Sequence, residues 1–338
     1  MATYKGIQGY SVQKLSSDPT ASEDTAGQLW YNSSTGKFKI VTTAAGAWSS
    51  GGNINTARYN VCASGASNTA ALIFAGYTTP PATYYDFTES YDGTSWTEVA
   101  DVNRTSGEGN AMGFGSLTSA LIAGGNPGMV AFTETWNGTS WTEVNNLTTG
   151  RDTMKGGGTS SGAGITFGGG IGTPPPANFY MKLTETWDGT SWTEVNNLNI
   201  GRQQMGSANQ GSSTANLCIA GELDAPYSPR TGAYVESWDG TCWTEVNNVN
   251  TARTNGGSAG IQTNALYFGG DPGGQTNTES YDGTSWTEVA DIATARIAGG
   301  SGGTGASAIL AGGNAPPASN LTEEWDDPTY TIKTVTVS

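Results

Sequence analysis

The stretch "WDGTSWTEVNN", residues 187–197, occurs four more times in the chain with small changes. Its near-copies are "YDGTSWTEVAD" (91–101), "WNGTSWTEVNN" (136–146), "WDGTCWTEVNN" (238–248) and "YDGTSWTEVAD" (281–291). In each copy two aromatic residues flank a short polar segment that contains glycine, which tolerates the positive φ of a tight hairpin turn. The stretch therefore predicts a β-hairpin in which aromatic residues such as Tyr91 and Trp96 pair across the strands.

The hairpin belongs to a longer repeating unit. Its second aromatic residue recurs at intervals of 45, 51, 51 and 43 residues, at Trp96, Trp141, Trp192, Trp243 and Trp286. A degenerate copy, "WDDPTYTI" (325–332), places Trp325 in the first aromatic slot and Tyr330 in the second. Ten residues after the second aromatic stands Arg151, Arg202, Arg253 or Arg296. Arg104 comes two positions early, and Arg58 stands at the same distance from Trp48.

Each unit also contains a glycine-rich segment and a short apolar run such as "ALIFAG". With the hairpin, these segments predict four antiparallel strands per unit. Four such strands repeated every 43–51 residues are typical of a β-propeller blade. The order of motifs resembles the kelch repeat family, and "GGDPGGQTNTESYDGTSWTEVADIATAR" (269–296) carries the whole pattern. The resemblance covers about residues 38–338 and implies an all-β, kelch-like propeller.

The number of blades is open between two alternatives. Six units from residue 59 onward each contain four predicted strands, and residues 28–58 read as a β-meander that we expect to form a seventh, first blade. Either "YSVQKL" (10–15) or "TIKTVTV" (331–337) would supply its remaining strand. The alternative is six blades with a separate N-terminal attachment element. The expected organisation is thus an attachment segment (1–27), the meander (28–58) and six repeats (59–338).

Composition excludes several classes of function. The net charge of −15 argues against binding nucleic acid or an anionic membrane surface, and no apolar run is long enough to span a bilayer. The chain has no histidine, which removes Ser-His-Asp and Cys-His catalysis and His-ligated zinc or copper. Cys62, Cys218 and Cys242 have no metal-ligand spacing and read as packing residues, with a Cys218–Cys242 disulfide as a weaker alternative. We therefore expect no enzyme, no cofactor and no metal.

The repetition of the charged residues favours a structural role for them. An arginine copied in every unit could line an anion channel, but the repetition favours a brace between blades. Glutamates recur two residues before the first aromatic and two after the second. They could suggest calcium binding or glycosidase chemistry, but a glycosidase needs two unlike carboxylates at one site. We expect them to lie on solvated edge strands, where charge discourages aggregation.

The loops between the second and third strands of each unit vary, and eleven of the thirteen prolines lie in them. Binding residues are usually carried on variable loops over a rigid scaffold. The tentative ligand or receptor residues are Tyr84, Tyr85, Phe179, Tyr180, Asp224, Tyr227, Arg230 and Tyr234. Three interpretations remain open: these aromatics fold over their own loops, form a surface for a glycan or receptor, or pack against a neighbouring subunit.

The N-terminal segment "GQLWYNSSTGKFKI…GAW" resembles segments of tail-fibre and other virion proteins of tailed phages, particularly marine ones, over roughly residues 1–58. The resemblance implies a non-enzymatic virion structural protein: a fibre, tail or capsid-surface component. Such a protein assembles in the host cytoplasm and needs no signal peptide. Its expected partners are other virion proteins through the N-terminal segment, a host-surface glycan or receptor, and further copies of the chain. A carbohydrate-binding, lectin-like propeller outside a virion is the alternative.

Overall fold

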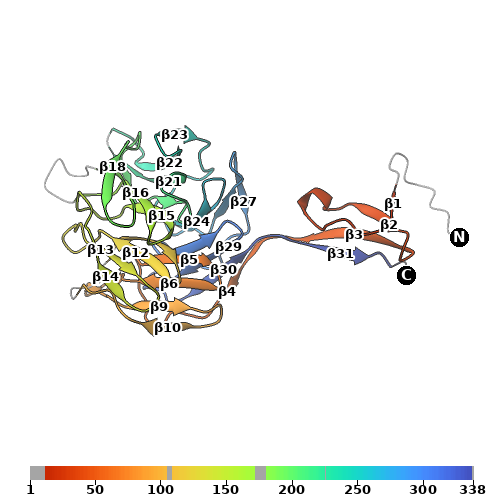
Figure 1. The fold of residues 1–338 in the computed structure, drawn as a ribbon, viewed down its shortest axis with the longest axis horizontal. Coiled ribbons are helices and arrows are strands. Elements are labelled where there is room, and N and C mark those ends of the chain that lie inside the picture. The colour runs from red at the N-terminus through yellow and green to blue at the C-terminus, as the bar shows by residue number, and fades with distance from the viewer. Residues whose placement is uncertain (1–11, 105–108, 172–179, 225, 337–338) are drawn as a thin grey trace. The chain divides into compact units, whose positions relative to one another are not determined.

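The computed structural model describes residues 12–104, 109–171, 180–224 and 226–336. The chain divides into two compact units. The repeat unit is Ala47–Asp326, and the terminal unit combines Met1–Gly46 with Asp327–Ser338. Apart from the short 3-10 helix η1 (Glu23–Thr25), the regular structure of the described residues is β-strand, as expected. Figure 1 shows the strands in chain order.

The described part of the repeat unit contains six main sheets. Sheet 1 contains β5 (Cys62–Ser67), β6 (Ala70–Phe74), β9 (Thr88–Tyr91) and β10 (Trp96–Val99). Sheet 2 contains β11 (Met112–Ser116), β12 (Ser119–Ala123), β13 (Thr133–Trp136) and β14 (Trp141–Glu143). Sheet 3 contains β15 (Lys155–Ser160), β16 (Ala163–Phe167), β17 (Thr184–Trp187) and β18 (Trp192–Val195).

The remaining sheets repeat this arrangement with two variations. In sheet 4, β19 (Arg202–Gln203) and β20 (Gly206–Ser207) both pair with β21 (Asn216–Leu223), followed by β22 (Thr231–Trp238) and β23 (Trp243–Val246). Sheet 5 contains β24 (Gly257–Ile261), β25 (Asn264–Phe268), β26 (Thr278–Tyr281) and β27 (Trp286–Val289). Sheet 6 contains β28 (Gly300–Thr304), β29 (Ser307–Ala311), β30 (Thr322–Asp326) and, from the other end of the repeat unit, β4 (Ala47–Ser50).

The repeated hairpin forms as the sequence predicts. Trp187 pairs with Trp192 across β17 and β18, and their ring centroids are 5.3 Å apart. At the turn, Asp188 Oδ1 accepts hydrogen bonds from the backbone N–H groups of Thr190 and Ser191, both at 2.8 Å, and Gly189 has φ +94°. These backbone hydrogen bonds lower the pKa of Asp188. Tyr91 and Trp96 form the corresponding stacked pair in sheet 1, at 4.7 Å.

The apolar second strands are buried on both faces. In β6, Leu72 packs in a cluster with Trp141 of sheet 2, whereas Ile73 packs with Ile309 of sheet 6. Sheet 1 therefore lies between sheets 2 and 6 and contributes one face to each. This explains why the second strand reads as a continuous apolar run rather than an alternating one.

Sheet 6 corrects the predicted position of Tyr330. The second aromatic slot beside Trp325 is filled by Trp48 of β4, and Tyr330 instead pairs with Thr43 in the terminal unit. The sixth copy has Asp327 and Pro328 where the other copies have Gly-Thr or its equivalent. Proline has no N–H for the aspartate of the turn, and aspartate replaces the glycine that takes positive φ, so the usual hairpin cannot form.

The same pairing divides the meander expected at residues 28–58. The strands near 28–32 and 37–41 pair with each other in the terminal unit, whereas residues 47–50 form β4 of sheet 6. Residues 13–15 and 331–334, which are parts of the two segments considered for a missing strand, also belong to the terminal sheet.

A series of hydrogen bonds links each sheet to the next. The indole N–H of the outer-strand tryptophan donates to a threonine hydroxyl of the preceding sheet at 3.0–3.1 Å in five cases: Trp96 to Thr322, Trp141 to Thr88, Trp192 to Thr133, Trp243 to Thr184 and Trp48 to Thr278. Trp286 donates to the Asn247 carbonyl instead, since Val235 occupies the threonine position in sheet 4. The first strands also contact one another in the order β5, β11, β15, β20, β24, β28 and back to β5.

The repeated arginines form ion pairs within single sheets, which corrects the expected brace between one blade and the next. Each lies in the connection that leads into a sheet and pairs with a glutamate of that sheet's third strand. The pairs are Arg58–Glu89 (2.6 Å), Arg151–Glu185 (2.9 Å), Arg296–Glu323 (3.1 Å), Arg202–Glu236 and Arg253–Glu279. All ten residues are buried.

These pairs correct the expectation for the glutamates. The glutamates before the first aromatic are buried ion-pair or hydrogen-bond partners, not solvated edge charges. The glutamates after the second aromatic, such as Glu98 and Glu194, are exposed, as expected. Cys62 and Cys218 are buried as packing residues, but Cys242 lies exposed in a turn, and no disulfide joins it to Cys218.

Sheet 2 provides a test of how burial affects one of these glutamates. Glu134 is buried and accepts hydrogen bonds from the Asn103 backbone N–H and side-chain amide. Its pKa is raised above the ordinary 4.5, mainly by burial, with the Asn103 hydrogen bonds opposing the shift. A carboxyl group with a raised folded-state pKa contributes stability that is present below its unfolded pKa and lost as the pH rises through the folded pKa.

We therefore expect wild-type protein to lose stability relative to Glu134→Gln as the pH rises from about 4 toward neutrality. Thermal unfolding of both proteins across this range measures the difference. Glu236→Gln is the matched variant at an arginine-paired position, and it should cost more at neutral pH, about 2 kcal/mol, since it weakens a charged hydrogen bond. A Glu134→Gln difference that is constant or of opposite sign would contradict the expectation.

The terminal unit contains one four-stranded sheet. Its strands are β1 (Gln13–Leu15), β2 (Leu29–Asn32), β3 (Lys37–Ala44) and β31 (Thr329–Thr334), in that order, with β1 parallel to β2. On one face Trp30 and Val41 are buried, and Asp18 accepts hydrogen bonds from Trp30, Asn32 and Lys39. The Lys39 ammonium, first among these, lowers the pKa of Asp18.

The opposite face of the terminal sheet carries exposed apolar side chains. Leu29 is opposite Ile40 and Tyr31 is opposite Phe38, so the four side chains share one face. Phe38 is 44% exposed, and Val335, whose backbone N–H donates to the Phe38 carbonyl, is 43% exposed.

Candidate functional site: a hydrogen-bonded ring and its surrounding loops

Six residues form a closed ring of backbone hydrogen bonds in the repeat unit. Each N–H donates to the carbonyl of the preceding member at 2.7–3.4 Å, and Asn60 closes the ring by donating to Ala298. The members are Asn60, Asn110, Thr153, Gln204, Asn255 and Ala298. All six have φ between +51° and +57°, a region that asparagine tolerates better than most residues. Five lie two residues before the first strand of a sheet, and Gln204 lies between β19 and β20 of sheet 4.

The ring lies at the edge of the sheets that carries the variable loops. Isolated bridges join the residue before a ring member to the beginning of the following loop, as in Tyr59 with Tyr77 and Thr254 with Asp271. We call this edge the loop edge. The nearly invariant turns, such as Asp188–Ser191, lie at the other end of the strands.

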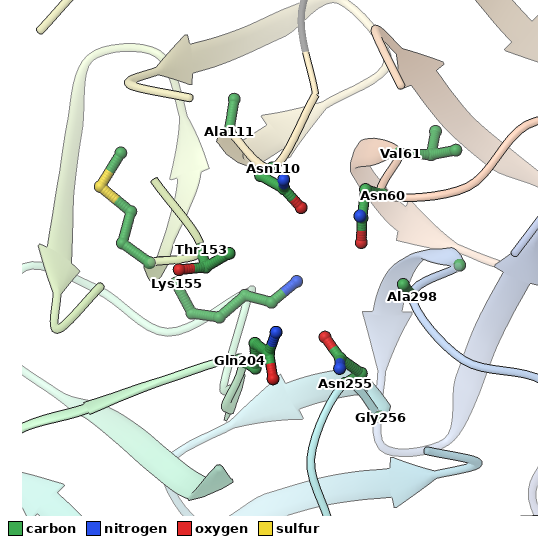
Figure 2. Close-up of a pocket in the computed structure, with 12 residues that line it drawn as sticks. Asn60, Val61, Asn110, Ala111, Thr153, Lys155, Gln204, Asn255, Gly256 and Ala298 are labelled. Atoms are coloured by element: carbon green, nitrogen blue, oxygen red, sulfur yellow. The ribbon is translucent and has the colours of Figure 1, made fainter. Parts of the chain in front are cut away.

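A pocket lies at the ring (Figure 2). Its cavity is about 30 Å³, and its lining includes all six ring members. Lys155, the first residue of β15, extends its ammonium group into the middle of the pocket, and the side chains of Asn60, Asn110, Gln204 and Asn255 point toward it (Figure 2). A second cavity of about 20 Å³ shares Lys155 with the first and is also lined by Ser207 and Asn209.

The tentative site residues of sheet 1 stack within their own loop. Tyr84 lies in β8 (Thr83–Tyr84), which pairs with β7 (Tyr77–Thr78), and its ring is 5.0 Å from that of Tyr77. Tyr85 stacks on Phe87 at 5.1 Å. The Asn60 side-chain amide donates to the Tyr77 hydroxyl at 2.8 Å, so this loop is connected to the ring.

A second group joins the loops of sheets 3 and 4. The Arg230 guanidinium lies 4.6 Å from the centre of the Tyr180 ring, and its Nε is 3.9 Å from a Glu222 oxygen. Burial and a hydrogen bond with Glu222 raise the pKa of Tyr180 to about 12. Gln203 donates to Glu222 and accepts from the ring member Thr153.

The structure therefore brings together only some of the predicted site residues. Tyr227 and Tyr234 contact each other at 5.9 Å, and the Asp224 backbone N–H donates to the Gly201 carbonyl. Among the described residues, no hydrogen bond, ion pair or ring contact joins Tyr84 or Tyr85 to the Tyr180–Arg230 group. Phe179 lies outside the described residues.

Sequence reasoning missed the ring and Lys155. A signal for the ring was present, since five members stand two residues after the repeated arginine. Lys155 lies in a glycine-rich segment that was interpreted from the sequence only as a strand. It is nevertheless one of two lysines in the repeat unit, beside Lys182.

No protein-family model matches the chain, and no curated protein matches it in sequence. Among the described residues, no helix is long and apolar enough to cross a membrane. The same residues contain no cluster of three or more His, Cys, Asp or Glu side chains arranged to hold a metal ion.

Proposed function

We propose that the protein is a non-enzymatic structural protein of a tailed-phage virion. In this proposal the terminal unit attaches the chain to the particle. The repeat unit is a six-bladed, kelch-like propeller that displays its loop edge for recognition of a host surface or a neighbouring subunit. Six blades with a separate attachment element is the second of the two arrangements considered from the sequence.

The observation that carries this proposal is the division between constant and variable edges. The turns of the repeated hairpins use the same aspartate or asparagine cap and the same glycine, while the loops at the other edge differ in length and contacts. A buried arginine–glutamate pair recurs within the sheets, and a tryptophan hydrogen bond links successive sheets in the same way. Such a scaffold can change its loops without changing its core.

The terminal sheet supports an attachment role. Phe38, Leu29 and Val335 lie on one exposed apolar face, and contiguous exposed apolar surface usually marks a contact site. Lys14 and Lys333 lie on the same face by register, opposite Tyr31 and Ile40. A neighbouring virion protein with an apolar patch and acidic residues at its edge would complement this surface.

Particle association is the test, since a carbohydrate-binding propeller outside a virion would use the same loop edge. Mass spectrometry of purified particles should detect the wild-type protein and should not detect Phe38→Asp. Ile261→Asp is the matched control, because Ile261 is also 44% exposed but lies in the repeat unit, and it should be incorporated normally. Absence of wild-type protein from particles would overturn the virion role, and normal incorporation of Phe38→Asp would overturn the attachment surface.

A further inference from the structure

The pocket at the ring contains a lysine ammonium and side-chain amides without protein partners. No described residue forms a hydrogen bond or ion pair with the Lys155 ammonium, and none bonds the side-chain amides of Asn110, Gln204 or Asn255. The backbone groups of the ring members already bond one another around the ring. The ammonium and the amide groups are therefore available to a bound molecule (Figure 2).

The cation has no carboxylate counterion in the described lining. Apart from Lys155, the residues that line the two cavities are neutral: asparagine, glutamine, serine, threonine, glycine and small apolar residues, with Met154 and Cys62. The acidic side chains of the adjoining loops form hydrogen bonds with residues other than Lys155. Asp152 accepts from Asn126 and Thr153, and Glu222 accepts from Gln203.

Lys155 is half-buried, and a positive charge that is partly withdrawn from water is stabilised by pairing with an anion. Burial lowers the pKa of Lys155, with the nearby Cys62 thiol opposing this effect. An anion in the pocket would replace the solvation that the ammonium has lost.

Lys155 is also a departure from the repeat. The other first strands begin with Cys62, Met112, Gly206, Gly257 and Gly300. Scaffold positions such as the paired arginines recur in sheet after sheet, whereas this lysine occurs in one sheet alone. A scaffold role common to the sheets therefore does not account for it.

We propose that the pocket binds one small monovalent anion, a carboxylate group, that enters from the loop edge and is held by the Lys155 ammonium and the Gln204 side-chain amide, whose nitrogen points toward the ammonium (Figure 2). One ammonium matches one negative charge. A cavity of about 30 Å³ holds a group of the size of a carboxylate or one to two waters. The carboxylate belongs either to a free small acid or to an acidic sugar presented to the loop edge. This site does not depend on the virion assignment.

Isothermal titration calorimetry on the full chain tests the site, with sodium acetate in chloride-free buffer at constant ionic strength. We expect millimolar binding by wild-type protein and a loss of at least about tenfold in affinity for Lys155→Met, the effect of removing one charged hydrogen-bond donor. Lys182→Met is the control, since Lys182 is exposed and lies outside the pocket lining, and it should bind like wild type.

A second variant separates binding from folding. Asn255→Asp places a carboxylate inside the ring, where it should pair with Lys155, raise the melting temperature and prevent acetate binding. Absence of acetate binding by wild type, or equal binding by Lys155→Met, would overturn the proposal and leave water as the occupant.

Galacturonate and galactose identify the source of the carboxylate. Lys155-dependent binding of galacturonate, without binding of galactose, assigns the site to an acidic sugar. Binding of acetate but not galacturonate assigns it to a free small anion.

Discussion

Replacing Arg202 by methionine is expected to lower the free energy of unfolding by about 3–5 kcal/mol. The Arg202 and Glu236 side chains are buried and ion-paired, and Arg202 also donates to the Tyr234 carbonyl at 2.7 Å. The substitution leaves Glu236 as a buried carboxylate with hydrogen bonds from Asn199 but without its cation. Equilibrium unfolding in guanidinium chloride, followed by tryptophan fluorescence, measures the loss.

Arg230→Met is the matched control. Its side chain is 31% exposed and its Nε is 3.9 Å from Glu222, so the loss should be about 1 kcal/mol or less. The double variant Arg202→Met/Glu236→Leu should recover part of the loss, because it removes the unpaired carboxylate as well. If Arg202→Met costs no more than Arg230→Met, the buried pairs do not stabilise the sheets as we infer.

The comparison between sequence and structure is most instructive at these glutamates. The repetition of arginine predicted a brace between blades, whereas each arginine pairs within the sheet that it leads into. The glutamates were misinterpreted because they alternate with threonine in short polar strands and resemble solvent-facing positions. Their partners lie 26–34 residues away in all five pairs, as for Arg253 with Glu279 and Arg202 with Glu236. The informative signal was that both charges recur together in nearly every unit.

The terminal unit shows a second limit of prediction from sequence. Periodicity placed Trp48 and Trp325 in the correct slots but could not show that they occupy the same sheet. The chain leaves the repeat unit after Asp326, where Asp327 and Pro328 interrupt the turn chemistry. The partner strand then comes from a segment more than two hundred residues earlier, and pairings of this kind have no local signature.

The candidate site was predictable only in part. The aromatic loop residues were recognised by their composition. In the structure, however, Tyr84 packs on Tyr77 and Tyr85 stacks on Phe87 within their own loop. The ring depends on backbone conformation, since positive φ at Thr153 or Ala298 has no side-chain signature. The importance of Lys155 depends on the absence of a counterion around it, which only the three-dimensional arrangement reveals.

Trp48→Ala is expected to destabilise the repeat unit by about 3 kcal/mol, the low end for large aromatic side chains, because Trp48 is half-buried against a core cluster. The Trp48 ring lies 4.7 Å from Phe268 of sheet 5 and 5.7 Å from Trp325 of sheet 6, and its indole N–H donates to Thr278. Trp48 therefore holds β4, the N-terminal strand of the repeat unit, against sheets 5 and 6. Its removal should release β4 and expose the edge of β30.

Hydrogen exchange can locate this effect. In Trp48→Ala, the amides of β30 that bond to β4 should exchange faster, while those of sheets 2 and 3 should change only through the global loss of stability. Tyr330→Ala is the matched control, because the repeat pattern assigns Tyr330 to the same slot but the structure pairs it with Thr43 in the terminal unit. It should leave β30 protected. Faster exchange of β30 in Tyr330→Ala, with protection retained in Trp48→Ala, would show that sheet 6 is completed by the C-terminal strand instead of β4.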